Sequence, residues 1–497
     1  MENQKRKTNY RLIICAMLFL ATMVNYLDRQ VLSLLVPDNT VYVNGVKEVL
    51  HKGMQAEFGW SEAQYGLIAG AFSLMYAICM IGAGRSIDIC GTKRGYLWAL
   101  GIWSTGAIIH AFSSIATAGI VDRSWIFDFD KSREILAVLT TTADKAALVA
   151  STSVGFFIFA RGVLALGEAG NFPAAIKATA EYFPQRDRAF ATSIFNSGST
   201  VGAMLAPVCI IPLGIKFGWE WAFILIGALG FIWMGIWVFV YKKPKEWKGK
   251  RINQAEWDYI QSDGQEEVQE KEKIPFREFF RQKATWSFAV GKFLSDAVWF
   301  FMLFFIPKYL ETVFHLGSRQ QIWPLTVLYF IVMISLFGGK LPTIIIDKTG
   351  KKPYEAHMQS MLIFAFFPLL LLIAQPMGQF SYWWTVILLG VAGAAHQSWS
   401  ANIFATVGTM FPKRAMATIT GIGGMAGGIA SFFMLVGCGI FQDYAEKVNL
   451  PFCGFEGKAA SYYIVFCVCA FAYLIGWLIM KSLVPKYKLV EIGSIKN

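Results

Sequence analysis

Charged residues are scarce in this chain. Asp, Glu, Lys and Arg together make up 16% of its 497 residues, whereas soluble domains usually carry about 25%. Hydrophobic residues reach 55%, and apolar runs of about 20 residues, each long enough to cross a bilayer as a helix, recur along the sequence. The shortage of charge therefore excludes an ordinary soluble domain and predicts a protein that crosses the membrane many times.

Several motifs are missing, and each absence excludes a class of function. There is no Walker loop, so we expect that ATP does not drive this protein. The five His residues are too scattered to form a metal site, and no enzyme signature is present. The run GIGG at 421–424 lies in an apolar segment and favours close helix packing. The first apolar run is too long for a cleavable signal and has no small-residue cleavage site. We predict no catalytic residue, cofactor or metal.

Neither net charge nor cysteine content changes this interpretation. The formal charge of +12 could indicate nucleic acid binding, but basic residues collect in the cytoplasmic loops of membrane proteins by the positive-inside rule, so no nucleic acid partner is predicted. The eight cysteines lie mostly inside apolar runs and are expected to be small core residues. A Cys438–Cys453 disulfide near the outer surface is a minor alternative.

Twelve apolar segments predict twelve membrane-spanning helices and an all-α membrane fold. Their approximate ranges are 12–36, 62–84, 95–116, 148–173, 188–212, 219–241, 285–311, 321–346, 358–376, 381–409, 415–440 and 460–483. Alternate loops carry clusters of basic residues: Lys5, Arg6, Lys7, Arg11, Lys93, Arg94, Arg186, Arg188, Lys348, Lys351, Lys352, Lys413, Arg414, Lys481, Lys486 and Lys488. All fall on one side if both termini are cytoplasmic, which is the predicted orientation.

A long polar stretch divides the chain in the middle. Residues 242–283 mix 11 basic with 9 acidic side chains, which is typical of a solvated cytoplasmic linker with short amphipathic helices. The predicted domains are an N-terminal six-helix bundle at 1–241, this linker, and a C-terminal six-helix bundle at 284–497.

An internal repeat supports that division. FPQRDRAFAT at 183–192 resembles FPKRAMAT at 411–418, and GRSIDICGTKR at 84–94 resembles IDKTGKK at 346–352. After the first echo, Gly198 and Gly202 match Gly424 and Gly428 at a small-xxx-small spacing that lets membrane helices approach closely. The echoes fall at matching places in two sets of six spans. They predict parallel repeats, an arrangement in which two halves rock about a central site.

Four charged residues stand inside predicted spans. Asp28 and Arg29 lie in the first, and Arg161 and Glu168 in the fourth. A charge at the bilayer centre costs several kcal/mol and normally faces a water-filled cavity or a partner. A spacing of seven puts Arg161 and Glu168 on one helix face, about 10 Å apart. Two structural ion pairs that only fix helix packing are the alternative to a functional site.

Specific stretches then resemble a known family. GRSIDICGTKR resembles the signature loop of the major facilitator superfamily, with Ile89 where a basic residue is usual. Other segments resemble the anion:cation symporter family, particularly its hexuronate transporters: NYLDRQVL, ARGVLALGEAGNFPAAIKATAEYFP, FNSGSTVGAMLAP, GKFLSDAVWFFMLFFIPKYL and AAHQSWSANIFATVGTMFP. This resemblance implies proton-coupled uptake of a sugar acid such as glucuronate or galacturonate. It also suggests a bacterial inner membrane.

A sugar acid that moves with protons needs a cation for its carboxylate and a carboxyl that takes up and releases a proton. The resemblance assigns Arg29 and Arg161 to the anion and Asp28 and Glu168 to the proton. A guanidinium matches a planar carboxylate with two hydrogen bonds. We predict that Glu168 pairs with Arg29 when the site is empty, and that protonation of Glu168 frees Arg29 for the substrate.

Neutral side chains are expected to bind the sugar hydroxyls. Tyr76, Gln397 and Asn402 are candidates mainly from the resemblance. The other candidates are Asn25, Asn196, Trp299, His396 and Ser400. Helix packing explains each of these alone equally well, and His396 could instead titrate or act as a structural donor. Lys292 and Asp296, at i and i+4, are predicted to form a local ion pair.

The segment 84–94 is predicted to close the cytoplasmic side. The resemblance implies that Asp88 pairs with a neighbouring helix end and stabilises the outward-open state. The predicted gating residues are Gly84, Asp88, Gly91, Lys93 and Arg94. Ala297 and Thr409 depart from the family pattern, in which a Pro and an acid are usual. The outer loops 38–60 and 117–147 are longer than usual, and no role is predicted for them.

Other functions stay open. The chain could carry an aldonate or aldarate, exchange anions, or act as a uniporter, while an organophosphate antiporter should have more basic residues in its cavity. A membrane sensor should have a longer signalling domain than the short tail after Val484. The predicted partners are an anionic sugar acid, protons and membrane lipid, and we expect a monomer.

Overall fold

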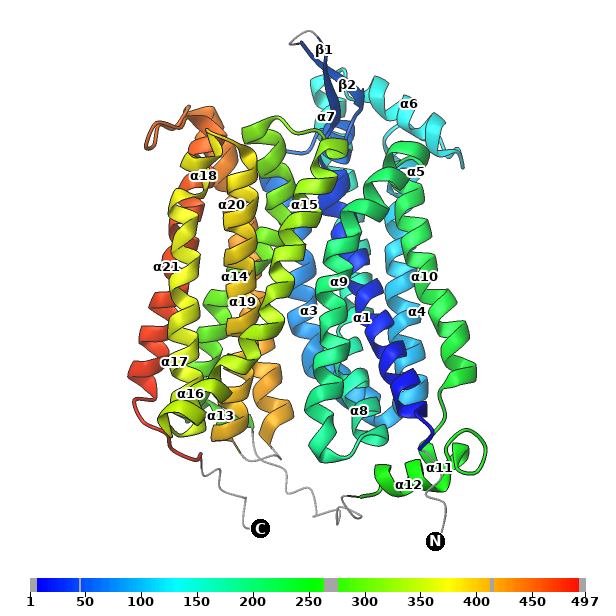
Figure 1. The fold of residues 1–497 in the computed structure, drawn as a ribbon. Helices are drawn as coiled ribbons and strands as arrows, with labels where there is room; N and C mark the ends of the chain where they lie inside the picture. The colour runs from blue at the N-terminus through cyan, green and yellow to red at the C-terminus, as the bar shows by residue number, and fades with distance from the viewer. Residues whose placement is uncertain (1–6, 44–45, 263–275, 412–414, 491–497) are drawn as a thin grey trace.

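The computed structural model describes residues 7–43, 46–262, 276–411 and 415–490, and long helices running side by side make up most of it (Figure 1). The β-hairpin lies at one end of the molecule, here called the hairpin end. The short helices of residues 242–283 lie at the opposite end, here called the linker end. Figure 1 places the helices of the N-terminal half of the chain beside those of the C-terminal half.

The long helices follow the apolar runs of the sequence. In the N-terminal half they are α1 (Tyr10–Leu35), α3 (Glu62–Cys90), α4 (Thr92–Ala111), α5 (Ser113–Val121), α7 (Ala143–Glu168), α8 (Asn171–Tyr182), α9 (Gln185–Phe217) and α10 (Trp219–Val240). In the C-terminal half the long helices are α14 (Lys283–Phe314), α19 (Tyr382–Met410), α20 (Met416–Lys447) and α21 (Gly457–Leu483). Two further spans are built from shorter pieces: α15 (Ser318–Val332), the 3₁₀ segment η1 (Met333–Lys340) and α16 (Leu341–Thr349) form one, and α17 (Pro353–Phe366), the 3₁₀ segment η2 (Phe367–Leu370) and α18 (Leu371–Gly378) form the other.

The all-α membrane fold is confirmed, with a smaller number of clear spans than predicted. Within the described ranges, ten helices are long and apolar enough to cross a membrane, and the pair α4 and α5, bent by 50°, makes an eleventh. The remaining predicted span, 381–409, forms the 29-residue helix α19. Its central run HQSWSAN is polar, which explains why it is less apolar than the other long helices.

The predicted close helix approaches are present. A Cβ added to Gly198 or Gly202 of α9 would stand 2.5 Å from a backbone oxygen of α1. Gly428 of α20 lies equally tight against α3, where an added Cβ would be 2.6 Å from the Cβ of Ala77. Glycine is therefore required where α9 crosses α1 and where α20 crosses α3, because any side chain would push the helices apart.

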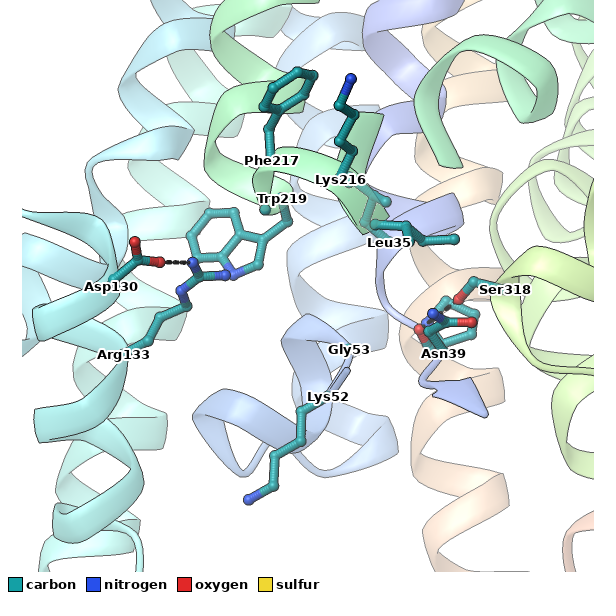
Figure 2. Close-up of a pocket in the computed structure, with 14 residues that line it drawn as sticks. Leu35, Asn39, Lys52, Gly53, Asp130, Arg133, Lys216, Phe217, Trp219 and Ser318 are labelled. Carbon is teal, nitrogen blue, oxygen red and sulfur yellow. Dashed lines mark hydrogen bonds and ion pairs between the residues drawn. The ribbon is translucent and has the colours of Figure 1, made fainter. Parts of the chain in front are cut away.

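The two long loops form a cap at the hairpin end. The first contains β1 (Asn39–Val43), β2 (Val46–His51), which pairs antiparallel with β1, and α2 (Met54–Phe58). The second contains α6 (Phe129–Leu139). A cavity of about 430 Å³ lies between them (Figure 2). It is lined by Leu35, Pro37, Asn39, Lys52, Gly53, Asp130, Arg133, Gly214, Ile215, Lys216, Phe217, Gly218, Trp219 and Ser318.

Short helices occupy the described part of residues 242–283, as the sequence predicts. They are α11 (Pro244–Trp247), α12 (Gln254–Ile260) and α13 (Phe276–Phe280). Glu256 of α12 anchors this segment, because its carboxylate accepts hydrogen bonds from the backbone N–H groups of Tyr10 and Arg11 at the start of α1. The disulfide alternative is wrong, since Cys438 and Cys453 are both free thiols.

Candidate functional site

A buried ion pair joins α1 to α7. Arg29 Nε donates to Glu168 Oε2 at 2.6 Å, and the two side chains are 4% and 0% exposed. This is the pairing that the sequence analysis predicts for the empty site. Because both groups are sealed from water, the pair holds two helices of the N-terminal half together and keeps each charge compensated.

Arg29 nevertheless has a guanidinium nitrogen that its pairing with Glu168 leaves without a hydrogen-bond partner in the described part of the chain. The rings of Tyr26, Phe72 and Tyr76 lie 5.0, 5.2 and 4.8 Å from the centre of its guanidinium. They fix the plane of the guanidinium through cation–π contacts. Nη2 of Arg29 and Oε1 of Glu168 have no hydrogen-bond partner among the described residues. The guanidinium is therefore oriented by aromatic rings and has a terminal nitrogen available for an anion.

Two further buried charges stand without a direct partner. All three guanidinium nitrogens of Arg161 and both carboxylate oxygens of Asp28 lack hydrogen bonds among the described residues, and the two side chains are 0% and 1% exposed. The centre of the Arg161 guanidinium lies 5.8 Å from the ring of Phe304, which belongs to α14 of the other half. Leaving such groups unsatisfied costs folding free energy, which favours a role in binding over a role in packing.

The predicted sugar-binding residues fall into separate groups. Tyr76 lies beside Arg29, and Asn25 is buried close to the Glu168 carboxylate. In the other half, the ring of Trp299 stacks on His396 with centroids 4.9 Å apart, and His396 Nδ1 is 2.8 Å from the Tyr473 hydroxyl. His396 thus has a structural partner, which the sequence did not identify.

The remaining candidates on α19 and α9 make no polar contact, among the described residues, with the buried charges of the N-terminal half. Asn402 Nδ2 donates to the carbonyl of Ser398, and Asn402 Oδ1 lies 2.9 Å from His357 Nδ1 of α17. Its amide is engaged inside the C-terminal half. Gln397 and Ser400 are half-buried and Asn196 is exposed. In the described part of the chain, no hydrogen bond or ion pair joins these three to the four buried charges of the N-terminal half.

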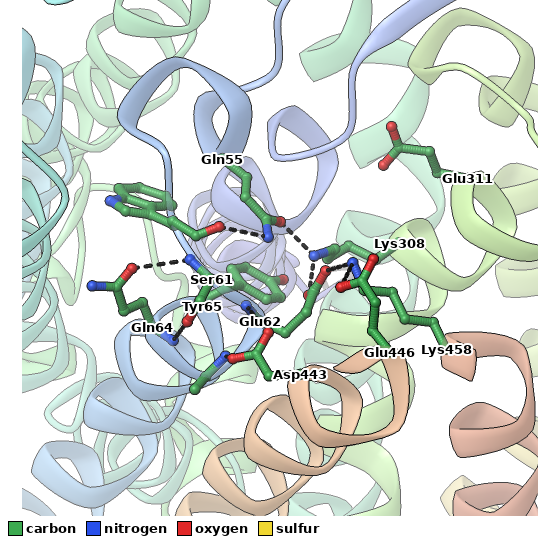
Figure 3. A network of polar contacts seen from close by, with 12 residues as sticks. Gln55, Ser61, Glu62, Gln64, Tyr65, Lys308, Glu311, Asp443, Glu446 and Lys458 are labelled. Carbon is green, nitrogen blue, oxygen red and sulfur yellow. Dashed lines mark hydrogen bonds and ion pairs between the residues drawn. The ribbon is translucent and has the colours of Figure 1, made fainter. Parts of the chain in front are cut away.

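A second polar network ties the two halves together at the hairpin end (Figure 3). Lys308 of α14 contacts the carboxylate of Glu62 and the side chain of Gln55. Lys458 Nζ lies 3.1 Å from the other oxygen of Glu62. The Asp443 carboxylate of α20 accepts hydrogen bonds from the backbone N–H groups of Glu62 and Ala63 at the first turn of α3. An acid at a helix N-terminus is favourable, and here it comes from the opposite half.

This network, called the hairpin-end tie below, was not predicted. Additional hydrogen bonds run beside it: Ser318 donates to Pro37 O, and the backbone N–H of Asp38 donates to Glu311. Among the described residues, the ion pairs that join the two halves lie only at this end. The structure is therefore closed at the hairpin end.

The segment 84–94 lies at the opposite end. Gly91 ends α3 with φ of +76°, a conformation that favours glycine, and its N–H bonds to Ile87 O. Lys93 Nζ donates to Val238 O at 2.7 Å, Gly84 is half-buried and Arg94 is exposed. The side chain of Asp88 lies outside the described residues, so its predicted pairing remains a prediction.

Comparisons with known proteins are consistent with this architecture. A family model described as Major Facilitator Superfamily matches residues 18–127 and 134–435. The chain is 26% identical to a hexuronate transporter of Escherichia coli K12 over 438 residues, which is 87% of this chain and 88% of that protein. It is also 26% identical to a probable galactarate/D-glucarate transporter of the same strain, over 62% of this chain and 60% of the relative. The crystal structure of a D-xylose–proton symporter superposes with a TM-score of 0.62 at 15% identity, covering 96% and 100% of the two chains.

Proposed function

The chain belongs to the major facilitator superfamily, and we propose that it is a symporter that carries a sugar acid, a hexuronate such as glucuronate or galacturonate, together with protons. It is a multi-pass membrane transporter and not an enzyme. The substrate class is supported by the similarity to the hexuronate transporter and by the cationic groups Arg29 and Arg161, which are buried in α1 and α7.

The Arg29–Glu168 pair carries the mechanism. With Glu168 ionised, its carboxylate holds Arg29 at 2.6 Å and competes with any substrate carboxylate. A proton on Glu168 removes that competition, and Arg29 can then offer Nε and the unpartnered Nη2 to the substrate as a bidentate pair. Substrate and proton thus favour each other's binding, which is the requirement for symport.

Asp28 and Arg161 supply a second acid and a second cation. Asp28 follows Tyr26 and Leu27 on α1, and its buried carboxylate has no hydrogen bond among the described residues. In this proposal Asp28 is the second titrating group, and Arg161 faces the boundary between the halves at Phe304 and stabilises the anion there.

Alternating access follows from the two sets of helices. We place both termini on the cytoplasmic side of an inner membrane, which puts the hairpin end outside. The structure then corresponds to a state closed to the outside, and the hairpin-end tie must break when the carrier opens outward. We take residues 1–241 and 284–497 as the two bundles that move and residues 242–283 as their linker, with the monomer as the working unit.

Uptake into proteoliposomes tests the proposal. Labelled glucuronate, galacturonate, galactonate and glucarate are offered with and without an inwardly directed proton gradient. The proposal predicts that the gradient drives hexuronate accumulation above equilibrium. Similarity to a probable galactarate/D-glucarate transporter makes aldarate transport the second candidate, and uptake of glucarate in preference to both hexuronates would select it. Equal distribution of hexuronate with the gradient present would refute proton symport and indicate a uniporter.

A further inference from the structure

An ion pair in the C-terminal half lies apart from the four charges considered so far. Lys292 Nζ lies 2.7 Å from Asp296 Oδ2 on the same face of α14, and the two side chains are 8% and 15% exposed. Gly427 of α20 makes room for the pair, because a Cβ there would stand 2.1 Å from Asp296 Oδ2. The ring of Phe404 lies 4.9 Å from the ammonium group. The pair is therefore built into the packing of α14, α19 and α20.

The same pair lies close to the boundary with the N-terminal half. On α20, a Cβ added to Gly427 would meet Asp296, and a Cβ added to the next residue, Gly428, would meet Ala77 of α3, which follows Tyr76. The Tyr76 ring lies 4.8 Å from the Arg29 guanidinium. The Arg29 site of one half and the Lys292–Asp296 pair of the other therefore approach the same place, where α20 packs against α3. In our inference, a sugar acid bound to Arg29 extends its far end toward α14.

The charge at that far end distinguishes two classes of sugar acid. A hexuronate has one carboxylate, and its far end carries only neutral oxygens. An aldarate has a second carboxylate at the opposite end of its six-carbon chain, and where that end lies against the C-terminal half it needs a cation there. Lys292 is a buried cation of that half, but Asp296 neutralises it. A neutral Lys–Asp pair still donates to and accepts from hydroxyl groups.

We propose that Asp296 is a specificity-determining residue, which neutralises Lys292 and thereby makes the carrier favour sugar monocarboxylates over dicarboxylates. This inference rests on the proposed function. The Asp296 carboxylate discriminates against an aldarate by repelling its second carboxylate. That carboxylate must either displace Asp296 from Lys292 or lie beside Asp296 without a cation.

The variant Asp296→Asn tests the inference, since it keeps the shape of the side chain and removes its charge. The measurement is inhibition of labelled galacturonate counterflow by unlabelled galacturonate and by glucarate in proteoliposomes, expressed as the ratio of the two half-inhibitory concentrations. We expect the ratio to shift toward glucarate by about tenfold or more, the effect of one charge-assisted hydrogen bond. Asp144→Asn, an exposed acid at the start of α7, is the matched control and should leave the ratio unchanged.

A second variant separates charge from packing. Lys292→Met combined with Asp296→Asn should lose the gain, because the freed cation is then absent. The inference is overturned if folded Asp296→Asn keeps the wild-type ratio, or if the double variant retains the gain. Should Asp296→Asn fail to elute as a single species, Asp296→Ser is measured in the same way and must give the same shift. If the wild-type protein takes up no sugar acid, the proposed function fails instead.

Discussion

Replacing Glu168 with Gln removes the carboxylate that holds Arg29 in the empty site. The bond is 2.6 Å long and both side chains are buried, so the change leaves a buried guanidinium without its counter-charge. Breaking a buried pair in this way costs about 3–5 kcal/mol of folding free energy. We therefore expect the ligand-free Glu168→Gln protein to melt at a lower temperature than the wild type.

Ligand binding should change in the opposite direction. In the wild type the substrate carboxylate must displace Glu168 from Arg29, and a hydrogen bond to a charged group contributes about 1.5–3 kcal/mol. Without that competitor, the dissociation constant for galacturonate should fall by about tenfold to hundredfold. The added ligand should also raise the melting temperature more than it does in the wild type, because it restores the missing counter-charge.

Calorimetric titration of purified protein gives the dissociation constant, and thermal unfolding with and without galacturonate gives the stability. Glu134→Gln, an exposed acid of α6, is the matched acid-to-amide control and should behave as the wild type. The variant should also lose accumulation driven by a proton gradient while it keeps counterflow. Weaker binding by a folded Glu168→Gln protein, or unchanged gradient-driven accumulation, would refute the competition between Glu168 and substrate.

Three further predictions address the rest of the molecule. Lys308→Met removes a cation from the hairpin-end tie, so spin labels on α6 and on the α20–α21 connection should show a larger population of long distances; an unchanged distribution would mean that the tie does not hold the closed state. Burial raises the pKa of Glu57 from 4.5 to about 8, so the folded protein binds this proton more tightly than the unfolded chain and loses stability as the pH rises between these values. Glu57→Gln should therefore match the wild type in melting temperature near about pH 4 and exceed it above pH 8, and equal curves at all pH values would contradict the assignment. Gly202→Val places a side chain against the Met23 carbonyl, because an added Cβ would stand 2.5 Å from that oxygen, and it should destabilise the fold by about 1–3 kcal/mol. Gly235→Val is the control, since a Cβ there meets nothing within 4 Å. Equal melting temperatures of the two variants would count against the close packing of α9 on α1.

Much of the fold is predictable because a membrane-spanning helix is marked by a local feature of the sequence, its long apolar run. A run of about 20 apolar residues must satisfy its own backbone hydrogen bonds, so helix is the expected result without knowledge of distant contacts. The sequence also predicts the pairing of Arg29 with Glu168 that the structure shows, because few charges lie inside the spans and a buried cation needs a buried anion. The helix α19 is less apolar than the other long helices because of residues 396–402. The same residues include its candidate binding residues.

The remaining contacts depend on packing that the sequence does not encode locally. Glu62, Lys308 and Lys458 stand near helix ends, where charges are common and usually solvated, so nothing distinguishes them until the two halves are placed together. Asn402 turns toward His357 because of how α19 is rotated, and a helix surrounded by apolar neighbours has no amphipathic pattern to reveal that rotation. The β-hairpin was not predicted, although the sequence contains a hairpin signal, the dipeptide Asn44-Gly45 between two strand-like runs.

The most direct test of the central claim follows proton movement itself. Proteoliposomes in weak buffer, with no imposed gradient, receive galacturonate outside while an electrode records the external pH. If Glu168 must be protonated before Arg29 can take the substrate, galacturonate entry should carry protons inward and make the outside more alkaline, and Glu168→Gln should show less alkalinisation per galacturonate taken up. Galacturonate entry into wild-type proteoliposomes with no change in external pH would contradict the account.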